Sequence, residues 1–487
     1  MSFRDLFRVK SIESVVAEEV PPGQGLRKCL GPVDLVLLGI GGIVGAGIFA
    51  LVGTAAAGDA ARPGAGPALI VSFLLTGAAC ALTALCYAEF ASLVPISGSA
   101  YTYAYTTLGE LVAWIIGWDL ILEYAVGNVA VAVSWSGYFC EFLRGFQVEF
   151  PRYLATDLRT ALHSPEILAA APRVLGIPLI FNLPAVAIVA AITFVLSIGI
   201  KESAWFNGLM VGIKLVVLAL FVVTGLCYIR PENWHPFAPN GWRGIQAGAA
   251  VVFFAFIGFD AVSTASEECR RPERDMPIGI LGSLAVCTAI YVVVAAVLTG
   301  MIPWRQLDTA EPLSVAMRVV HQPWTAGIVA FGSIVAHTAV LLVFQLGQPR
   351  ILLSMSRDGL LPSVLARTHP RFQTPHVATI LTGVFVALGS AVASLEEMAD
   401  LCNIGTLSAF VIVCLGVIVL RRREPDRRRP FKTPWVPLLP VLGVLACMYL
   451  MLGLPATAWI RFAVWLCVGL TCYAGYGCRK SRLHQAA

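Results

Sequence analysis

The chain has 487 residues, of which 58% are hydrophobic and only 13% are charged, and its formal net charge is +5. A soluble domain carries about 25% charged residues, and so few charges cannot cover this much apolar surface in water. The mean hydropathy of +0.79 agrees with this. The composition indicates a membrane protein. It excludes disordered, collagenous and disulfide-framework chains and disfavours nucleic-acid binding.

A helix needs about 20 mostly apolar residues to cross the hydrocarbon core of a bilayer. Twelve such stretches lie between polar or Pro- and Gly-rich breaks, which predicts an all-α integral membrane protein with twelve transmembrane helices. The predicted spans are 33–54, 67–94, 109–140, 179–200, 205–229, 244–267, 278–302, 324–353, 376–393, 398–420, 436–454 and 457–477.

The basic residues predict how these spans are oriented. With the N-terminus inside, 22 of the 34 Lys and Arg residues fall in inside segments and about ten in outside segments. Cytoplasmic loops carry such an excess, so both termini are expected in the cytoplasm and the protein in the inner or plasma membrane. Residues 1–32 are polar and precede an apolar run too long for a signal peptide. We interpret the basic run in the 421–435 loop as a topogenic stop, with anionic-lipid binding as the alternative.

The cysteines give no sign of a metal site or a disulfide framework. Thirteen are scattered through the chain, mostly inside predicted spans, without a C-x-x-C pair or a Cys/His cluster. We read them as small apolar fillers and expect no metal and no cofactor.

The first span is unusually rich in glycine. It contains Gly39, Gly41, Gly42, Gly45 and Gly47, and each glycine weakens a helix by about 1 kcal/mol relative to alanine. Such a span either packs closely against a neighbouring helix or is interrupted where it lines a cavity.

The sixth span carries a glycine and a carboxylate near mid-membrane, in the sequence FFAFIGFD at 253–260. The first and sixth spans begin two successive groups of five. Matched interrupted segments in two halves of a membrane protein indicate a transporter binding site, so we favour a site over simple close packing.

Several long motifs, in the same order, resemble a known family. They are GPVDL (31–35) leading into GIGGIVGAGIF (39–49), YAEFASLVPISGSAYTY (87–103), GWDLILEYAVG (117–127), FFAFIGFDAVSTASEE (253–268) and GQPRILLSMSRDGLLP (347–362). With these motifs the chain resembles permeases of the amino acid–polyamine–organocation superfamily, most closely the cationic amino acid transporter family.

The resemblance implies a LeuT-like fold with an inverted repeat of five plus five helices. The parts would be a cytoplasmic segment 1–32, repeats at 33–229 and 244–420 with discontinuous first helices, a basic loop 421–435, two further helices in 436–477 and a tail 478–487. It also implies a protein that functions as a monomer, with an L-amino acid and membrane lipid as its partners.

A broken helix suits an amino-acid zwitterion. Free backbone N–H groups at a half-helix N-terminus bind the carboxylate, and free carbonyls at the preceding half-helix bind the ammonium. The resemblance assigns the N–H donors to Gly45, Ala46 and Gly47, and the carbonyl acceptors to Ile43, Phe254, Ala255 and Ile257. Many relatives carry a hydroxyl residue where this chain has Ala46, so one hydrogen bond to the carboxylate would be missing.

Lys214 lies near the centre of the fifth span. Ionisable residues at such depth are functional by default, and burial disfavours the charged form of a lysine. Lys214 is therefore a candidate for binding and releasing the coupling proton. The resemblance implies that it occupies the place where sodium-coupled relatives hold a cation, with Thr338 as the matching hydroxyl on the eighth helix. The alternative is a permanent salt bridge.

Other polar residues in the spans have less defined roles. Glu123, in the third span, could balance Lys214, line the substrate route or meet a cationic side chain, and the sequence does not choose. Asp260 is expected to cap or neutralise the break in the sixth span, and Glu89 to be structural or gating.

Two residues of the eighth span remain. His337 is expected to be a packing histidine held by hydrogen bonds, with proton relay as the alternative. Phe344 would favour small or medium substrates if it faces the site.

Together these features predict a secondary active transporter that moves an L-amino acid by alternating access, with proton-coupled uptake. The alternatives are an uncoupled facilitator or exchanger, and an amino-acid sensor with little transport. No paired Asp, H-E-x-x-H or G-x-S-x-G pattern indicates an enzyme. Whether the substrate is cationic or small and neutral stays open.

Overall fold

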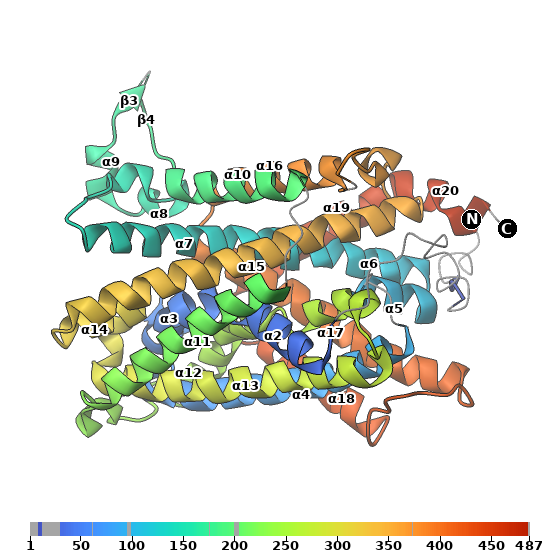
Figure 1. Cartoon of the computed structure of the whole chain (residues 1–487), viewed down its shortest axis with the longest axis horizontal. Coiled ribbons are helices and arrows are strands. Elements are labelled where there is room, and N and C mark those ends of the chain that lie inside the picture. The colour runs from blue at the N-terminus through green and yellow to red at the C-terminus, as the bar shows by residue number, and fades with distance from the viewer. Residues whose placement is uncertain are drawn as a thin grey trace.

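A computed structural model describes residues 8–11, 30–60, 62–94, 99–174, 176–198, 204–372 and 374–485. Long helices run side by side along the molecule, and both chain ends lie at the same end of the bundle (Figure 1). Residues 95–98 of the 87–103 motif, most of the 1–32 segment and the end of the fourth predicted span lie outside the described residues.

Each of the twelve predicted spans falls on an apolar helical segment. In the described residues, eight helices are long and apolar enough to cross a membrane, one bent pair passes the same test as a unit, and three apolar helices are shorter. The segments are α2 (Pro32–Ile43) with η2 (Gly47–Leu51) and α3 (Val52–Ala57); η3 (Gly66–Ala68) with α4 (Leu69–Leu93); α6 (Glu110–Ile121), η4 (Leu122–Val126) and α7 (Gly127–Arg144); α10 (Leu183–Ile198); α11 (Ala204–Leu226); α12 (Gly241–Val252), η7 (Phe253–Phe256) and η8 (Asp260–Glu268); α13 (Pro272–Met301); α15 (Pro323–Arg357); α16 (His376–Val392); α17 (Leu395–Arg423); α18 (Leu438–Met451); and α19 (Ala456–Cys472) with η11 (Tyr473–Gly477) and α20 (Cys478–Lys480).

Several helices are longer than their predicted spans. The helix α13 begins six residues before the predicted start, with Pro272 in its first turn and Glu273 and Asp275 beside it. Acidic residues stabilise a helix N-terminus but lower its hydropathy. Hydropathy therefore finds the part of a helix that lies in hydrocarbon and misses its polar ends.

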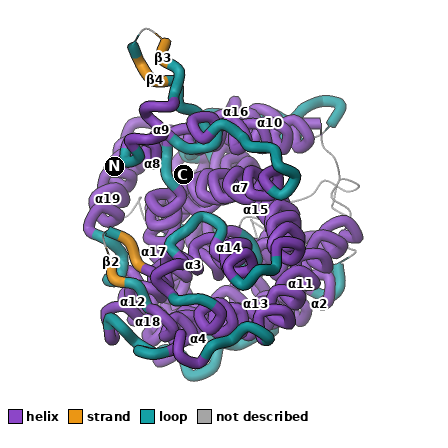
Figure 2. Tube along the Cα trace, turned by 90° about the vertical axis from the view of Figure 1, so that its left-hand side faces the viewer, coloured by secondary structure: helices purple, strands orange, loops and turns teal. Residues whose placement is uncertain are grey.

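Short elements connect the spans. They are α5 (Ser99–Thr107), η5 (Arg152–Leu154), α8 (Leu158–Leu162), α9 (Pro165–Ala170), η6 (Pro231–Trp234), η9 (Trp304–Leu307), α14 (Pro312–Val319), η10 (Ser363–Ala366) and α21 (Arg482–Gln485). Two antiparallel two-stranded ribbons pair β1 (Gly58–Asp59) with β2 (Arg62–Pro63) and β3 (Arg173–Val174) with β4 (Ile177–Pro178). Figure 2 looks onto the end opposite the chain termini. Both ribbons lie at this end, and α14 lies near the centre of the view.

The outer helices carry their large apolar side chains outward. On α16, Leu381 and Leu388 are 54% and 66% exposed, whereas Thr379 and Gly383 face the interior. A soluble protein would bury these leucines. Because small residues on the inner face let helices approach closely, and because Thr193 of α10 fills the space beside Gly383, this arrangement fits a bundle surrounded by lipid.

The first and sixth spans are both broken, as the sequence predicts. The first bends by 48° between α2 and η2, where Val44 is extended. The sixth loses regular helix after Phe256, and Gly258 has a φ of +112°, which only glycine adopts readily.

The two breaks lie against each other. A Cβ added to Gly258 would lie 2.8 Å from the carbonyl oxygen of Gly42. A Cβ on Gly47 would lie 2.2 Å from the Cα of Ala255. Both explanations for the glycines of the first span therefore apply. The span is interrupted, and its glycines also let the sixth span pack closely against it.

We expect Gly47→Ala to separate the two broken spans. The new methyl group would meet backbone atoms rather than a movable side chain, and overpacking of this kind costs about 1–3 kcal/mol. Thermal unfolding of the purified protein should show a lower melting temperature. Gly327→Ala is the matched control, since nothing lies within 4 Å of an added Cβ there, and a melting temperature equally unaffected in both variants would contradict the prediction.

Candidate substrate site at two broken helices

Lys214 of α11 is hydrogen-bonded to the break of the first span. Its Nζ donates to the carbonyl oxygens of Gly41 at 2.7 Å and Val44 at 3.0 Å. The side chain is fully buried, and no carboxylate among the described residues is paired with it. The permanent salt bridge considered from the sequence is therefore not seen in the described part of the chain.

Tyr291 of α13 joins the two breaks, although no sequence pattern singles it out. Its hydroxyl lies 3.1 Å from the carbonyl oxygen of Ile43 and 2.9 Å from that of Ala255. Both carbonyls are among the acceptors that the resemblance implies for the substrate ammonium. A buried tyrosine on an apolar helix is an ordinary core residue, so only its two partners reveal this role.

The predicted N–H donors lie at the start of the second half of the first span. Gly45 precedes the new helical turn, and its carbonyl accepts the first bond of that turn from Phe49 N at 3.2 Å. The N–H groups of a first helical turn have no partner within the helix. Gly45, Ala46 and Gly47 therefore lie at the N-terminal start of this half-helix, with Gly47 against Ala255.

Phe254 and Ile257 belong to the same junction. Both are buried; Phe254 lies in η7 and Ile257 is the residue at which the chain turns extended. The structure therefore brings together all seven residues of the first and sixth spans that the sequence selected for binding an amino-acid backbone.

Thr338 lies on α15 and is not bonded to Lys214. Its hydroxyl accepts from Trp135 Nε1 at 3.0 Å and donates to the carbonyl of Ile334 at 2.7 Å. The neighbouring His337 is fully buried between Ser134 and Ser333. Both residues connect α15 to α7 in the described structure.

Glu123 and Asp260 face each other. The chain forms a single π-helical turn, η4, around Glu123, and such turns are frequent at functional sites. The two carboxyl groups interact directly and are fully buried. Phe344 of α15 lies nearby, with its ring 5.5 Å from that of Tyr124. We refer to the region around Glu123, Tyr124 and Phe344 as the compartment.

Glu89 joins α4 to the loop between α17 and α18. Its carboxylate accepts from Arg421 at 3.1 and 2.8 Å and from the backbone N–H of Thr433 at 2.8 Å, and it pairs with Arg429 at 3.3 Å. The arginines of this basic run therefore differ: some pair with Glu89 and others are exposed. Arg421 and Arg429 serve the buried carboxylate, whereas Arg422 and Arg428 are exposed.

A second charged cluster lies at the end opposite the chain termini. Glu141, near the end of α7, pairs with Arg144 at 2.9 Å and with Arg318 of α14. Glu311, directly before α14, lies against Gly137 of α7. Burial and then repulsion by Glu141 raise the pKa of Glu311 to about 7, although Arg144 and Arg318 oppose the shift.

This cluster should make the attachment of α14 depend on pH. The raised pKa means that the folded state binds the Glu311 proton more tightly than the unfolded state does, so stability falls as pH rises from the ordinary glutamate value of 4.5 to about 7. We expect the melting temperature to fall between pH 5 and pH 8 by more in the wild type than in Glu311→Gln. Glu149→Gln, an exposed change at the same end, should keep the wild-type dependence; an equal fall in all three proteins would contradict the prediction.

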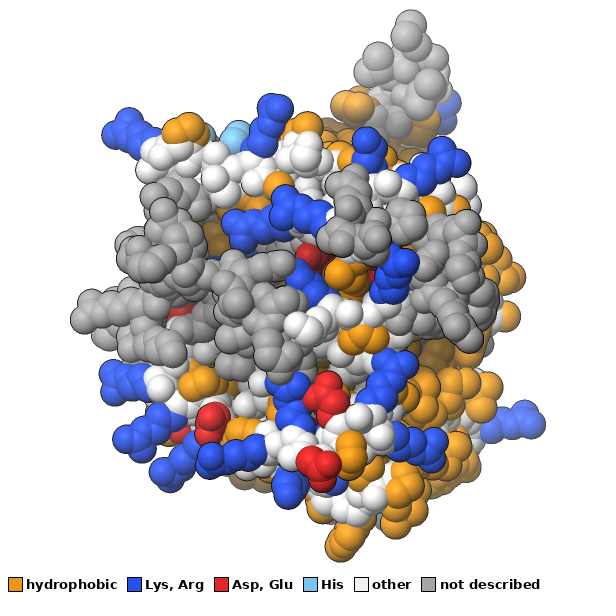
Figure 3. Space-filling view, turned by 90° about the vertical axis from the view of Figure 1, so that its right-hand side faces the viewer, with side chains coloured by type: hydrophobic (Ala, Val, Ile, Leu, Met, Phe, Trp, Pro, Cys, Tyr) orange, Lys and Arg blue, Asp and Glu red, His pale blue; other side chains and the backbone are white. Residues whose placement is uncertain are grey.

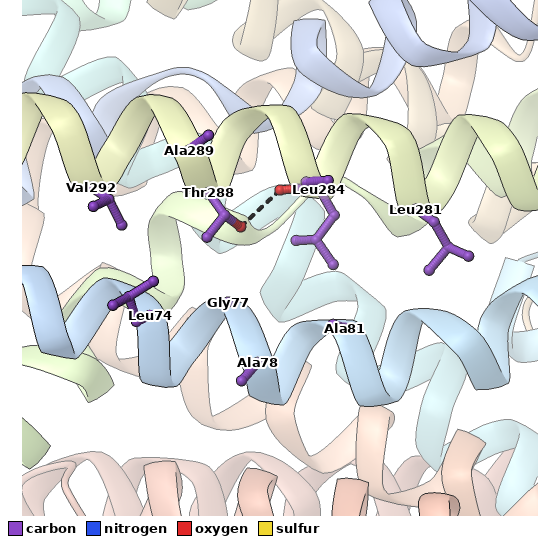
Figure 4. A pocket seen from close by; sticks show the side chains of 10 residues that line it. Leu74, Gly77, Ala78, Ala81, Leu281, Leu284, Thr288, Ala289 and Val292 are labelled. Atoms are coloured by element: carbon purple, nitrogen blue, oxygen red, sulfur yellow. Dashed lines mark hydrogen bonds between the residues drawn. The ribbon is translucent and has the colours of Figure 1, made fainter. Parts of the chain in front are cut away.

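A separate groove lies between α4 and α13. Figure 4 shows its lining side chains, among them Leu74, Leu281 and Val292, and the one hydroxyl among them, that of Thr288, donates to Leu284 O at 2.8 Å. Leu74 is 51% exposed. We expect lipid chains to fill this groove, because its lining offers no partner for an amino-acid zwitterion.

The apolar helices and the site define a multi-pass membrane protein with two apposed broken helices. The chain matches the amino acid permease family model over residues 30–472. It belongs to this family, and it is a transporter rather than an enzyme.

Three relatives show the range of the family. The chain is 48% identical to the branched-chain amino acid permease BcaP of Bacillus subtilis and 45% identical to the methylthioribose transporter of the same organism, each over 99% of both chains. It is 40% identical to the mouse cationic amino acid transporter 4, over 83% of this chain and 61% of that protein.

Proposed function

We propose that this permease imports an L-amino acid across the bacterial plasma membrane by alternating access, coupled to a proton that Lys214 binds. The observation that carries the proposal is the pair of bonds from Lys214 to the carbonyls of Gly41 and Val44, at the end of α2 where the first span breaks. A protonated lysine holds both carbonyls more strongly than a neutral one, because charge-assisted hydrogen bonds are the stronger kind.

Proton release would thus loosen α2 from α11. A loosened half-helix can swing away from the site and open it to one side of the membrane, whereas the protonated state keeps it closed. Substrate and proton share the same junction, which is how a single movement couples them. Helix repeats in inverted order, as the resemblance implies, would supply the two alternative openings.

The end with the chain termini would face the cytoplasm. Figure 3 shows lysine and arginine side chains spread over that end, in agreement with the excess of basic residues in the inside segments. There Lys10 pairs with Asp358 at 3.0 Å and Tyr101 donates to Asp358 at 2.7 Å. These bonds tie the N-terminal segment to the ends of α15 and α5, and they would have to break for the site to open inward.

The substrate side chain would enter the compartment of Glu123, Tyr124 and Phe344. BcaP bears the name of a branched-chain permease and other relatives bear the names of cationic transporters. The compartment contains features suited to both: an aromatic wall formed by Tyr124 and Phe344, and the carboxyl of Glu123. We propose a neutral branched or basic L-amino acid as the substrate.

Liposomes that contain only this protein test the proposal. Radiolabelled leucine, alanine, lysine and arginine are supplied with and without an inward proton gradient, and methylthioribose is tested as a competitor. We expect accumulation of an amino acid only with the gradient. Flux that is independent of pH and stimulated by substrate on the far side would support an exchanger, and binding without flux would support a sensor; either result contradicts proton-coupled import.

A further inference from the structure

The carboxyl pair of Glu123 and Asp260 is the largest group of unpartnered polar atoms near the proposed site. None of the four carboxyl oxygens makes a well-aligned hydrogen bond in the described residues, and neither do the hydroxyls of Tyr87, Tyr103 and Tyr124. Only weaker approaches are present: Thr406 lies beside Glu123, and the backbone N–H groups of Gly258 and Ala261 lie beside Asp260. All of these side chains are at most 1% exposed. A native protein rarely buries polar groups in this way unless a water, an ion or a ligand completes them.

The polar side chains that lie beside the pair in the described residues carry no positive charge. Tyr87 comes from α4, Tyr103 from α5 and Tyr124 from η4, while Cys402 and Thr406 of α17 lie beside Glu123. Tyrosine and cysteine titrate above neutral pH in water. No lysine, arginine or histidine among the described residues pairs with either carboxylate, and Lys214 is engaged elsewhere.

Two carboxylates in contact cannot both be ionised in such a place. Their mutual repulsion and the cost of burying charge both favour protonation, as in other carboxyl pairs that titrate as a unit. Without a cation nearby, the pair therefore holds protons. These protons are distinct from the one on Lys214, which bonds to the first span rather than to this compartment.

The pair lies within reach of a substrate bound at the breaks. Asp260 follows Ile257 by three residues, and Ile257 ends the half-helix whose carbonyls are the proposed acceptors. Tyr291 fixes the Ala255 carbonyl of the same half-helix. A side chain directed from this junction towards η4 would meet the carboxyl pair next to Tyr124.

We propose that a basic amino-acid side chain takes the place of one proton on the Glu123–Asp260 pair. In this exchange an O–H bond of the pair breaks, the proton leaves to water, and the ammonium or guanidinium group enters with its own charge. The compartment stays neutral in both cases. A neutral amino acid leaves the proton in place. Transport of a basic amino acid would therefore carry one proton fewer than transport of a neutral one.

Proton release on binding tests this inference, which rests on the proposed function. Purified protein is titrated with L-arginine and with L-leucine by calorimetry in two buffers of different ionisation enthalpy. We expect arginine to release about one proton more than leucine per molecule bound. Equal proton counts for the two ligands would overturn the exchange while leaving proton-coupled transport intact, and so would binding of leucine without any binding of arginine.

Isosteric variants locate the exchanged proton. Glu123→Gln combined with Asp260→Asn should remove the difference in proton count and weaken arginine binding by roughly 30-fold or more, with leucine affected much less. Asp119→Asn is the control, because Asp119 is a buried carboxyl one turn before Glu123 that does not belong to the pair. If Asp119→Asn instead removes the difference, the assignment to the pair is wrong; if neither ligand binds the wild type, the proposed function fails together with the inference.

Discussion

Lys214→Ala is expected to abolish the accumulation of amino acid that a proton gradient drives. The variant loses two hydrogen bonds from a buried amine to the carbonyls of Gly41 and Val44, and hydrogen bonds of charged groups contribute about 1.5–3 kcal/mol each. Even one such bond corresponds to a factor of at least about ten in the population of the closed state. The measurement is radiolabel accumulation in liposomes with the interior more alkaline than the exterior.

The controls for this prediction separate coupling from folding. Exchange of labelled for unlabelled substrate without a gradient should persist in Lys214→Ala if the variant folds, because the glycines and carbonyls of the breaks are unchanged. Lys480→Ala, a change of an exposed lysine near the chain end, should accumulate substrate like the wild type. Full accumulation by Lys214→Ala would show that the proton is bound elsewhere, with the Glu123–Asp260 pair as the next candidate.

Glu89→Gln is expected to destabilise the protein strongly. The glutamate is fully buried and pairs with Arg421 and Arg429, of which the second is only 4% exposed in its side chain. Removing one partner of a buried ion pair costs about 3–5 kcal/mol, because it leaves the other charge buried and uncompensated. The amide also cannot accept from Arg421 and Thr433 as a carboxylate does.

Thermal unfolding of the purified protein measures this loss. Glu424→Gln is the matched control in the same loop, since Glu424 pairs with Arg427 at 2.7 Å but is 40% exposed, and such pairs contribute about 0–1 kcal/mol. Similar melting temperatures for the two variants would mean that the contacts of Glu89 with Arg421, Arg429 and Thr433 do not stabilise the loop between α17 and α18. A melting temperature that is unchanged together with altered transport would instead make Glu89 a gating residue, the other role expected from the sequence.

The sequence predicts the spans well because hydropathy reports a local property. A residue in a span faces lipid or another helix, and both environments select apolar side chains within the same stretch. The breaks could also be predicted from the sequence, since Gly258 adopts a positive φ that only glycine tolerates readily and Gly47 leaves room for Ala255. The polar ends of helices such as α13 were missed, because their residues lie outside the hydrocarbon.

The contacts among distant residues depend on how the helices pack. Tyr291 reaches Ile43 across 248 positions of the chain, and Arg421 reaches Glu89 across 332. No local pattern indicates that a tyrosine or an arginine has such a partner. The hydrogen-bond partners of Thr338 likewise depend on packing, since its hydroxyl accepts from Trp135 of α7.

The sequence by itself determined that this chain is a membrane protein with two interrupted spans and a few charges inside them, because solvent and backbone preferences act on each residue separately. The tertiary structure decided what those charges meet. Lys214 bonds to backbone carbonyls at the first break, and Glu123 meets Asp260 at the second. Charges buried far apart in the chain become partners only when the helices that carry them are packed, and in a medium of low dielectric constant those partners decide which groups hold a proton.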